Sequence, residues 1–154
     1  MSAKEPGALT THIFVVGYDR TPSSRHAVQW ATKELQGQHA KLVIVHACRP
    51  LHAPSLSTSA ERSRFGKAMI DELLLEGEDE MFDIDIETAV ADENPVTALI
   101  DAAYTHSAEA IVIGSEPHSL LRKALGTVSS QLHENSPVPV IVVPADAAPF
   151  HSPN

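Results

Sequence analysis

The stretch AIVIGSEPHSLLRKALGTVSSQL, residues 110–132, begins as a buried strand and ends as the start of a helix. An apolar run from Ala110 leads to Gly114, and a second glycine, Gly126, precedes the hydroxyl side chains of the predicted helix. Two glycines that bracket such a loop are typical of a seat for phosphate groups. Pro117 lies inside the loop, where a phosphate-binding backbone favours glycine and a free N–H. The stretch predicts a strand, a loop and a helix, and leaves open whether the loop binds a nucleotide.

Five short runs rich in apolar and β-branched residues predict the strands of one sheet. They cover residues 13–18, 41–48, 82–90, 109–114 and 138–144. Helical spacing of apolar residues separates successive runs, which is typical of parallel strands joined by helical crossovers. We therefore expect an α/β fold, an open doubly wound five-stranded parallel sheet with helices on both faces. Alternation in the third run, and Pro139 and Pro144 in the fifth, predict that these two strands form edges.

Capping residues and apolar stripes predict the helices. Ser23 or Ser24 is expected to cap the first helix, and Asn94, followed by Pro95, to cap the third. The side chains expected to face inward from the second and the last helix are Phe65, Met69, Leu73, Val128 and Leu132. Residues 49–63 are rich in Pro, Ser and Arg and are expected to form a mobile loop.

Composition limits the class of protein. The chain has 154 residues, enough for one domain, which we place at 12–144 between flexible tails at 1–11 and 145–154. A net charge of −9 argues against nucleic acid and anionic membranes as partners. The single cysteine, Cys48, excludes an internal disulfide and fits a cytoplasmic protein. The nine histidines show no metal-ligand spacing, so no metal site is expected among them.

Candidate binding residues follow the first and fourth predicted strands, because ligands of doubly wound sheets bind beyond the carboxyl ends of the strands. Asp19 is suited to accept a ribose hydroxyl, but it could equally cap the first helix or order the turn that follows. The free backbone amides after Gly126 could bind a phosphate, or simply begin an ordinary helix. The sequence contains neither GxxxxGK[ST] nor GxGxxG, and no catalytic residues can be assigned.

Four stretches together resemble the universal stress protein family, and the resemblance spans residues 12–144. The stretches are VVGYDRTPSSRHAVQWA (15–31), LVIVHA (42–47), NPVTALIDAA (94–103) and the segment 108–144 that includes residues 110–132. The resemblance implies the strand order 3-2-1-4-5 and a homodimer formed through the fifth strand. An apolar edge on that strand supports the same expectation, since a monomer would leave it exposed. Its residues are Val138, Val140, Ile141, Val142 and Val143.

The resemblance also implies a ligand, ATP or a related adenine nucleotide, with Mg²⁺ accompanying the phosphates. The residues expected to bind it are Gly17, Asp19, Ala47, Ile113, Gly114, Gly126, Thr127, Val128 and Ser129. ATP-binding members carry Gly-x-x-Gly, nine residues, and then Gly-Ser/Thr. Here the second glycine is replaced by Pro117, and only the eight residues 118–125 precede Gly126. Glu93 also stands where many members have glycine.

Three functions are compatible with these residues. The first is a stress-response nucleotide sensor whose adenine-nucleotide site is present but degraded. The second is a dimeric stress-protein scaffold that does not bind ATP tightly, which Pro117 and the shortened loop favour. The third is a weak ATP hydrolase, which has the least support because no general base can be assigned.

Overall fold

Five parallel strands form one sheet in the order β3-β2-β1-β4-β5. This computed structural model describes residues 10–48, 58–77, 84–115 and 128–144. The strands are β1 (His12–Gly17), β2 (Ala40–Ala47), β3 (Asp85–Ala91), β4 (Ala110–Ser115) and β5 (Val140–Pro144). The predicted fold class and strand order are both confirmed, and every strand lies within three residues of its expected start.

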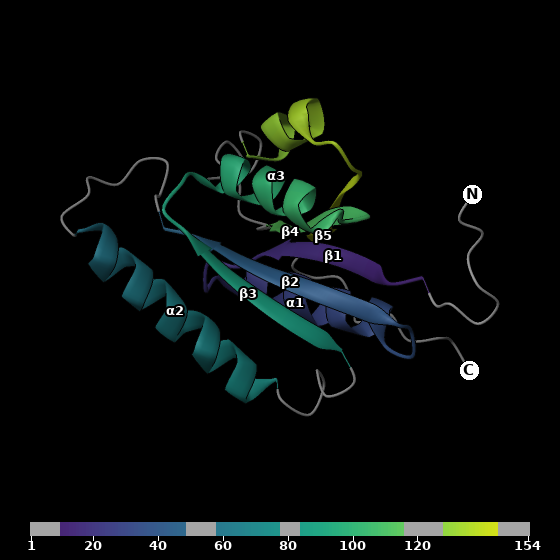
Figure 1. The fold of residues 1–154 in the computed structure, drawn as a ribbon, viewed down its shortest axis with the longest axis horizontal. Coiled ribbons are helices and arrows are strands. Elements are labelled where there is room, and N and C mark those ends of the chain that lie inside the picture. Colours follow the sequence, from purple (N-terminus) through teal and green to yellow (C-terminus); the bar gives the residue numbers. More distant parts are fainter. Residues whose placement is uncertain (1–9, 49–57, 78–83, 116–127, 145–154) are drawn as a thin grey trace.

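Helices cover both faces of the sheet (Figure 1). The first three are α1 (Pro22–Leu35), α2 (Ser59–Glu76) and α3 (Pro95–His106), and a further helical segment covers residues 128–135. α1 and α2 lie on one side of the sheet, and α3 and the segment 128–135 lie on the other. The result is a three-layer arrangement with the sheet in the middle.

Alternating side chains of the strands supply two separate apolar cores, because successive residues of a strand point to opposite faces. Toward α1 and α2 lie the buried side chains of Val16, Leu42, Ile44 and Val112. Toward α3 lie those of Val15, Val43, Val45 and Ile111, together with the fully buried Leu132 of the segment 128–135. Val128 packs against this second core, so the expectation for Val128 and Leu132 is confirmed.

The first helix begins two or three residues earlier than expected. Thr21, rather than Ser23 or Ser24, is its N-cap, and its Oγ1 accepts a hydrogen bond from the Ser24 backbone N at 3.2 Å. Pro22 occupies the first turn of the helix, where a backbone N–H has no partner within the helix. Its missing N–H therefore costs no hydrogen bond. Both serines are therefore buried inside the helix.

The cap of the third helix was predicted correctly. Asn94 accepts a hydrogen bond at Oδ1 from the Thr97 backbone N at 2.9 Å, and Pro95 is the first residue of α3. A side-chain acceptor followed directly by proline marks a helix start, and it did so here.

The predictions for α2 were partly wrong. Residues 59–63 are helical, because Thr58 and Glu61 form a reciprocal capping box. Residues 49–57 of the expected loop lie outside the described part of the chain. Met69 and Leu73 are buried as expected, but the Phe65 side chain is 59% exposed. The stripe that faces the sheet starts at Gly66, and Phe65 lies at its margin.

β3 and β5 form the two edges of the sheet, as expected. The apolar residues of β5 are not all exposed, however. Val142 is 37% exposed, whereas Val143 is 2% exposed and belongs to the core beneath α1. Val138 and Val140 pack against the opposite core. The expected tails at 1–11 and 145–154 lie outside the described residues, apart from residues 10 and 11.

Candidate functional site

The carboxyl ends of β1, β2 and β4 lie at the same edge of the sheet. Gly17 pairs with Val45 of β2, and Val16 pairs with Val112 of β4. From β1 the sheet continues to β2 and β3 on one side and to β4 and β5 on the other. The strand order therefore reverses between β1 and β4. In doubly wound sheets this reversal opens a crevice beyond the strand ends. Gly17, Ala47, Ile113 and Gly114 are brought together here.

Asp19 follows β1 at this edge, and its carboxylate orders the turn between β1 and α1. Its Oδ1 accepts hydrogen bonds from the Thr21 backbone N at 3.1 Å and from Thr21 Oγ1 at 2.5 Å. Its own backbone N donates to Ser24 Oγ at 3.2 Å. Arg20, between them, adopts a left-handed φ of 71°, a conformation that non-glycine residues rarely take. Of the roles left open for Asp19, ordering the turn is therefore confirmed.

Gly114 has a packing role that sequence reasoning missed. A Cβ at this position would lie 2.3 Å from Ser23 O and 2.9 Å from Ser24 N, both backbone atoms of α1. Glycine is required because β4 and the first turn of α1 approach too closely for any side chain. At Gly17 a Cβ would meet only side-chain atoms, of Leu99 at 3.4 Å and of Ile113 at 3.9 Å, which are ordinary contacts.

Of the remaining predicted site residues, the structure describes four and leaves two outside the described part of the chain. Ala47 is half-buried and packs toward α3, and Ile113 is buried on the same face. Val128 and Ser129 are half-buried in the segment 128–135. Gly126 and Thr127, with Pro117, lie outside the described residues. The structure thus describes the side of the site expected to hold the ribose and the base.

Two ion pairs join the region after β1 to α2. Arg25 of α1 pairs with Glu76 at the end of α2, and Arg20 Nη2 lies 3.8 Å from Glu72 Oε2. The Tyr18 side chain is buried between these helices, and burial raises the pKa of its phenol. The two arginines that follow β1 are therefore directed to α2 carboxylates.

The described part of the chain contains no group of three His, Cys, Asp or Glu side chains able to hold a metal ion. Within the same residues, none of the helices has the length and apolar character needed to cross a membrane.

The family model of universal stress proteins matches residues 10–144 of the chain. The chain belongs to the universal stress protein family. A curated universal stress protein of Mycolicibacterium smegmatis is 26% identical over 154 residues, which cover 94% of this chain and 52% of the relative. The chain thus spans about half the length of that curated relative.

Solved universal stress proteins share the fold. One in complex with cAMP is 26% identical, with a TM-score of 0.61 over 88% of this chain and 98% of the other. Another, from Archaeoglobus fulgidus in complex with dAMP, is 17% identical, with a TM-score of 0.63 over 88% of this chain and 99% of the other. The sheet order described above is therefore that of the universal stress protein fold.

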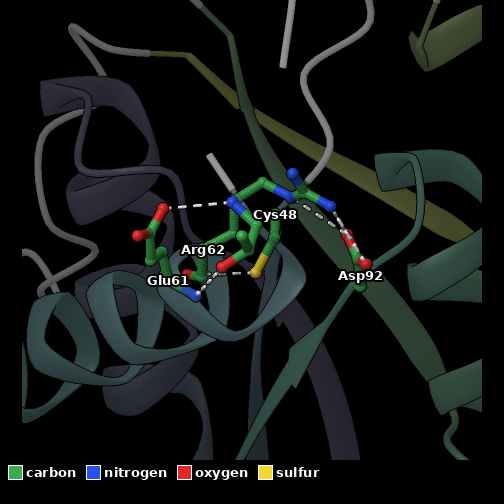
Figure 2. Close-up of polar contacts among 5 residues, drawn as sticks. Cys48, Glu61, Arg62 and Asp92 are labelled. Carbon is green, nitrogen blue, oxygen red and sulfur yellow. Dashed lines mark hydrogen bonds and ion pairs between the residues drawn. The ribbon is translucent and has the colours of Figure 1, made fainter. Parts of the chain in front are cut away.

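One polar cluster at this edge was not predicted from the sequence. Arg62 of α2 donates from Nε and Nη2 to the two carboxylate oxygens of Asp92, each at 3.2 Å (Figure 2). Cys48 lies beside the pair, and its Sγ donates to the Arg62 backbone O at 3.5 Å. Burial raises the pKa of the Cys48 thiol. The residues of this cluster are far apart in sequence, so only the placement of α2 over β2 and β3 could have revealed it.

Proposed function

We propose that this universal stress protein is a stress-response nucleotide sensor that binds an adenine nucleotide in the crevice between β1 and β4. The observation that carries the proposal is the position of Asp19, an ordered carboxylate directly beyond the central strand. A family member of 26% identity was solved with cAMP, which supports an adenine nucleotide as the ligand. A cytoplasmic location is part of the same proposal, in keeping with the free thiol of Cys48.

The turn geometry suits a contact with ribose. Both hydrogen bonds from Thr21 to the Asp19 carboxylate end on Oδ1. Oδ2 can therefore accept a hydrogen bond from a ribose hydroxyl while Oδ1 keeps its hydrogen bonds within the turn. A hydrogen bond to a charged acceptor contributes about 1.5–3 kcal/mol, so Asp19 should account for a large part of the affinity for a small nucleotide.

Calorimetric titration with ATP, AMP and cAMP tests the proposal. Asp19→Asn keeps an oxygen for the turn but removes the charge, so it should weaken binding by about tenfold or more without unfolding the protein. Asp71→Asn, at an exposed position on α2, is the matched control that removes the same charge elsewhere. Absence of saturation with all three nucleotides for the unmodified protein would refute the proposal.

For ATP itself we propose weaker binding than in family members with the complete glycine motif. Pro117 removes an N–H, and the loop before Gly126 is one residue short, so the outer phosphates lose contacts. Pro117→Gly combined with one inserted residue before Gly126 should raise the affinity for ATP by about tenfold, as expected for one or two recovered hydrogen bonds. Tight binding of ATP by the unmodified chain would show that Pro117 is no obstacle.

We also propose a homodimer through β5. The half-exposed Val142 lies on an edge strand, and an edge strand carries backbone groups able to pair with a second chain. Analytical ultracentrifugation should show a dimer at micromolar concentration, and Val142→Lys should favour the monomer. A monomer at all concentrations would contradict this proposal. A dimer that binds no nucleotide would instead favour the scaffold function.

A further inference from the structure

His46 of β2 contacts the backbone that carries Asp19. Its Nδ1 lies 2.9 Å from the Tyr18 backbone O. A carbonyl oxygen can only accept, so Nδ1 carries the hydrogen and donates it. His46 follows Leu42 and Ile44 in strand alternation, which places its ring on the face of the sheet covered by α1 and α2.

The peptide bond between Tyr18 and Asp19 is therefore held from both sides. Its carbonyl accepts from His46, and its N–H donates to Ser24 Oγ at 3.2 Å. Ser24 is fixed in turn, because its Oγ donates to the Thr21 backbone O at 3.0 Å. The Asp19 carboxylate bonds to Thr21 as well. The orientation of this peptide bond thus depends on two side chains, His46 from β2 and Ser24 from α1.

Packing against α2 keeps the His46 ring in place. A Cβ at Gly66 would lie 2.6 Å from His46 Cδ2 and 2.9 Å from Val90 Cγ1. The ring consequently fills the space that a larger residue at position 66 would occupy. His46 is half-buried, so this close contact restricts the ring on the side away from Tyr18.

We infer that His46 is a positioning residue of the nucleotide site, which acts by holding the Tyr18–Asp19 peptide so that Asp19 is oriented for the ligand. The inference rests on the proposed function for the role of Asp19 in binding. In this role His46 acts through Asp19 and needs no contact with the ligand. Its contribution is to limit the rotation of the peptide bond that precedes the carboxylate.

Two amide substitutions separate positioning from general packing. His46→Asn places an N–H donor where Nδ1 stands, whereas His46→Gln places it near the position of Nε2. Hydrogen exchange of the Asp19 backbone amide, followed by NMR, reports the peptide directly and requires no ligand. We expect His46→Gln to speed this exchange by about three- to tenfold, the range for loss of one neutral hydrogen bond, and His46→Asn to leave it close to normal.

Titration of the same samples with ATP, AMP and cAMP measures the effect on the site. His46→Gln should weaken binding of whichever of ATP, AMP and cAMP the unmodified protein binds by about three- to tenfold, and it should cause no further loss in the Asp19→Asn background. An equal loss in both backgrounds, or normal Asp19 exchange in His46→Gln, would overturn the inference. If the unmodified protein binds none of ATP, AMP and cAMP, the proposed function fails, and the exchange comparison alone decides whether His46 holds the Tyr18–Asp19 peptide. Should His46→Gln not fold, His46→Asn decides, because it keeps the donor at the Nδ1 position: faster Asp19 exchange or weaker nucleotide binding in His46→Asn than in the unmodified protein would overturn the inference.

Discussion

Replacing Gly114 by alanine should destabilise the protein strongly, although the change adds one methyl group. The new Cβ would lie 2.3 Å from Ser23 O, 2.5 Å from Ser23 C and 2.9 Å from Ser24 N. All three atoms belong to the backbone of α1, so no side chain can rotate away to make room. The strand and the helix must separate, although α1 packs against β4.

The size of the effect follows from the cost of overpacking, which is typically about 1–3 kcal/mol. Because the colliding atoms are backbone, we expect the upper end of that range, about 3 kcal/mol. Gly17→Ala is the matched control at the same sheet edge, where the added Cβ would meet Leu99 Cδ2 at 3.4 Å. Since φ at Gly17 is not positive, alanine there should be neutral or stabilise by about 0.4–1 kcal/mol through the unfolded state.

Urea denaturation followed by the fluorescence of Trp30 measures both variants. Trp30 is the single tryptophan, and it stacks on Phe14 with ring centroids 6.4 Å apart, so unfolding changes its surroundings. With a slope of about 2 kcal/mol per molar urea, Gly114→Ala should lower the midpoint by about 1.5 M. Equal midpoints for Gly114→Ala and the unmodified protein would refute the steric reasoning. A loss of nucleotide binding in this variant would then need a different explanation from helix displacement.

Three further outcomes are expected. Leu73→Ala should lower the free energy of unfolding by about 2–5 kcal/mol and the exposed Phe65→Ala by less than about 1 kcal/mol, as measured by urea denaturation. Lys41 donates a hydrogen bond to Glu87 and holds the pKa of Glu87 below its usual range, so stability is lost as pH falls through that lowered pKa. Lys41→Met should raise the pKa of Glu87 in an NMR titration and reduce this loss of stability, because the folded and unfolded pKa values then lie closer together. Cys48 should react with a thiol reagent at least about tenfold more slowly in the folded than in the denatured protein, and equal rates would contradict its burial.

The sheet could be predicted because its signals are local. Each strand is a short run of β-branched residues, and the Asn94–Pro95 pair marks the start of α3 through a single turn of backbone. The rotation of α2 could not be predicted in this way. Phe65 satisfies the helical spacing as well as Gly66 does, and only the close approach of His46 and Val90 shows why glycine faces the sheet.

In the candidate site, too, local features could be predicted from the sequence and contacts between elements could not. Asp19 could be placed beyond the central strand from its position in the sequence. The groups that hold its backbone could not, because Ser24 of α1 accepts from the Asp19 N–H and His46 of β2 donates to the preceding Tyr18 carbonyl. Gly114 was interpreted as a ligand-binding residue for its place after a strand. Its steric role is visible only when the first turn of α1 is in position.

The register of the central strand has a consequence for the order in which the protein can assemble during synthesis. β1 pairs on one side with β2, where His12 lies beside Ala40, and on the other with β4, where Phe14 lies beside Ala110. The first pairing is available once a small part of the chain has left the ribosome, whereas the second must wait for most of it. The crevice between β1 and β4 therefore forms only after β4 has been synthesised and has paired with β1, so a ligand of this crevice can bind only chains that have reached that stage.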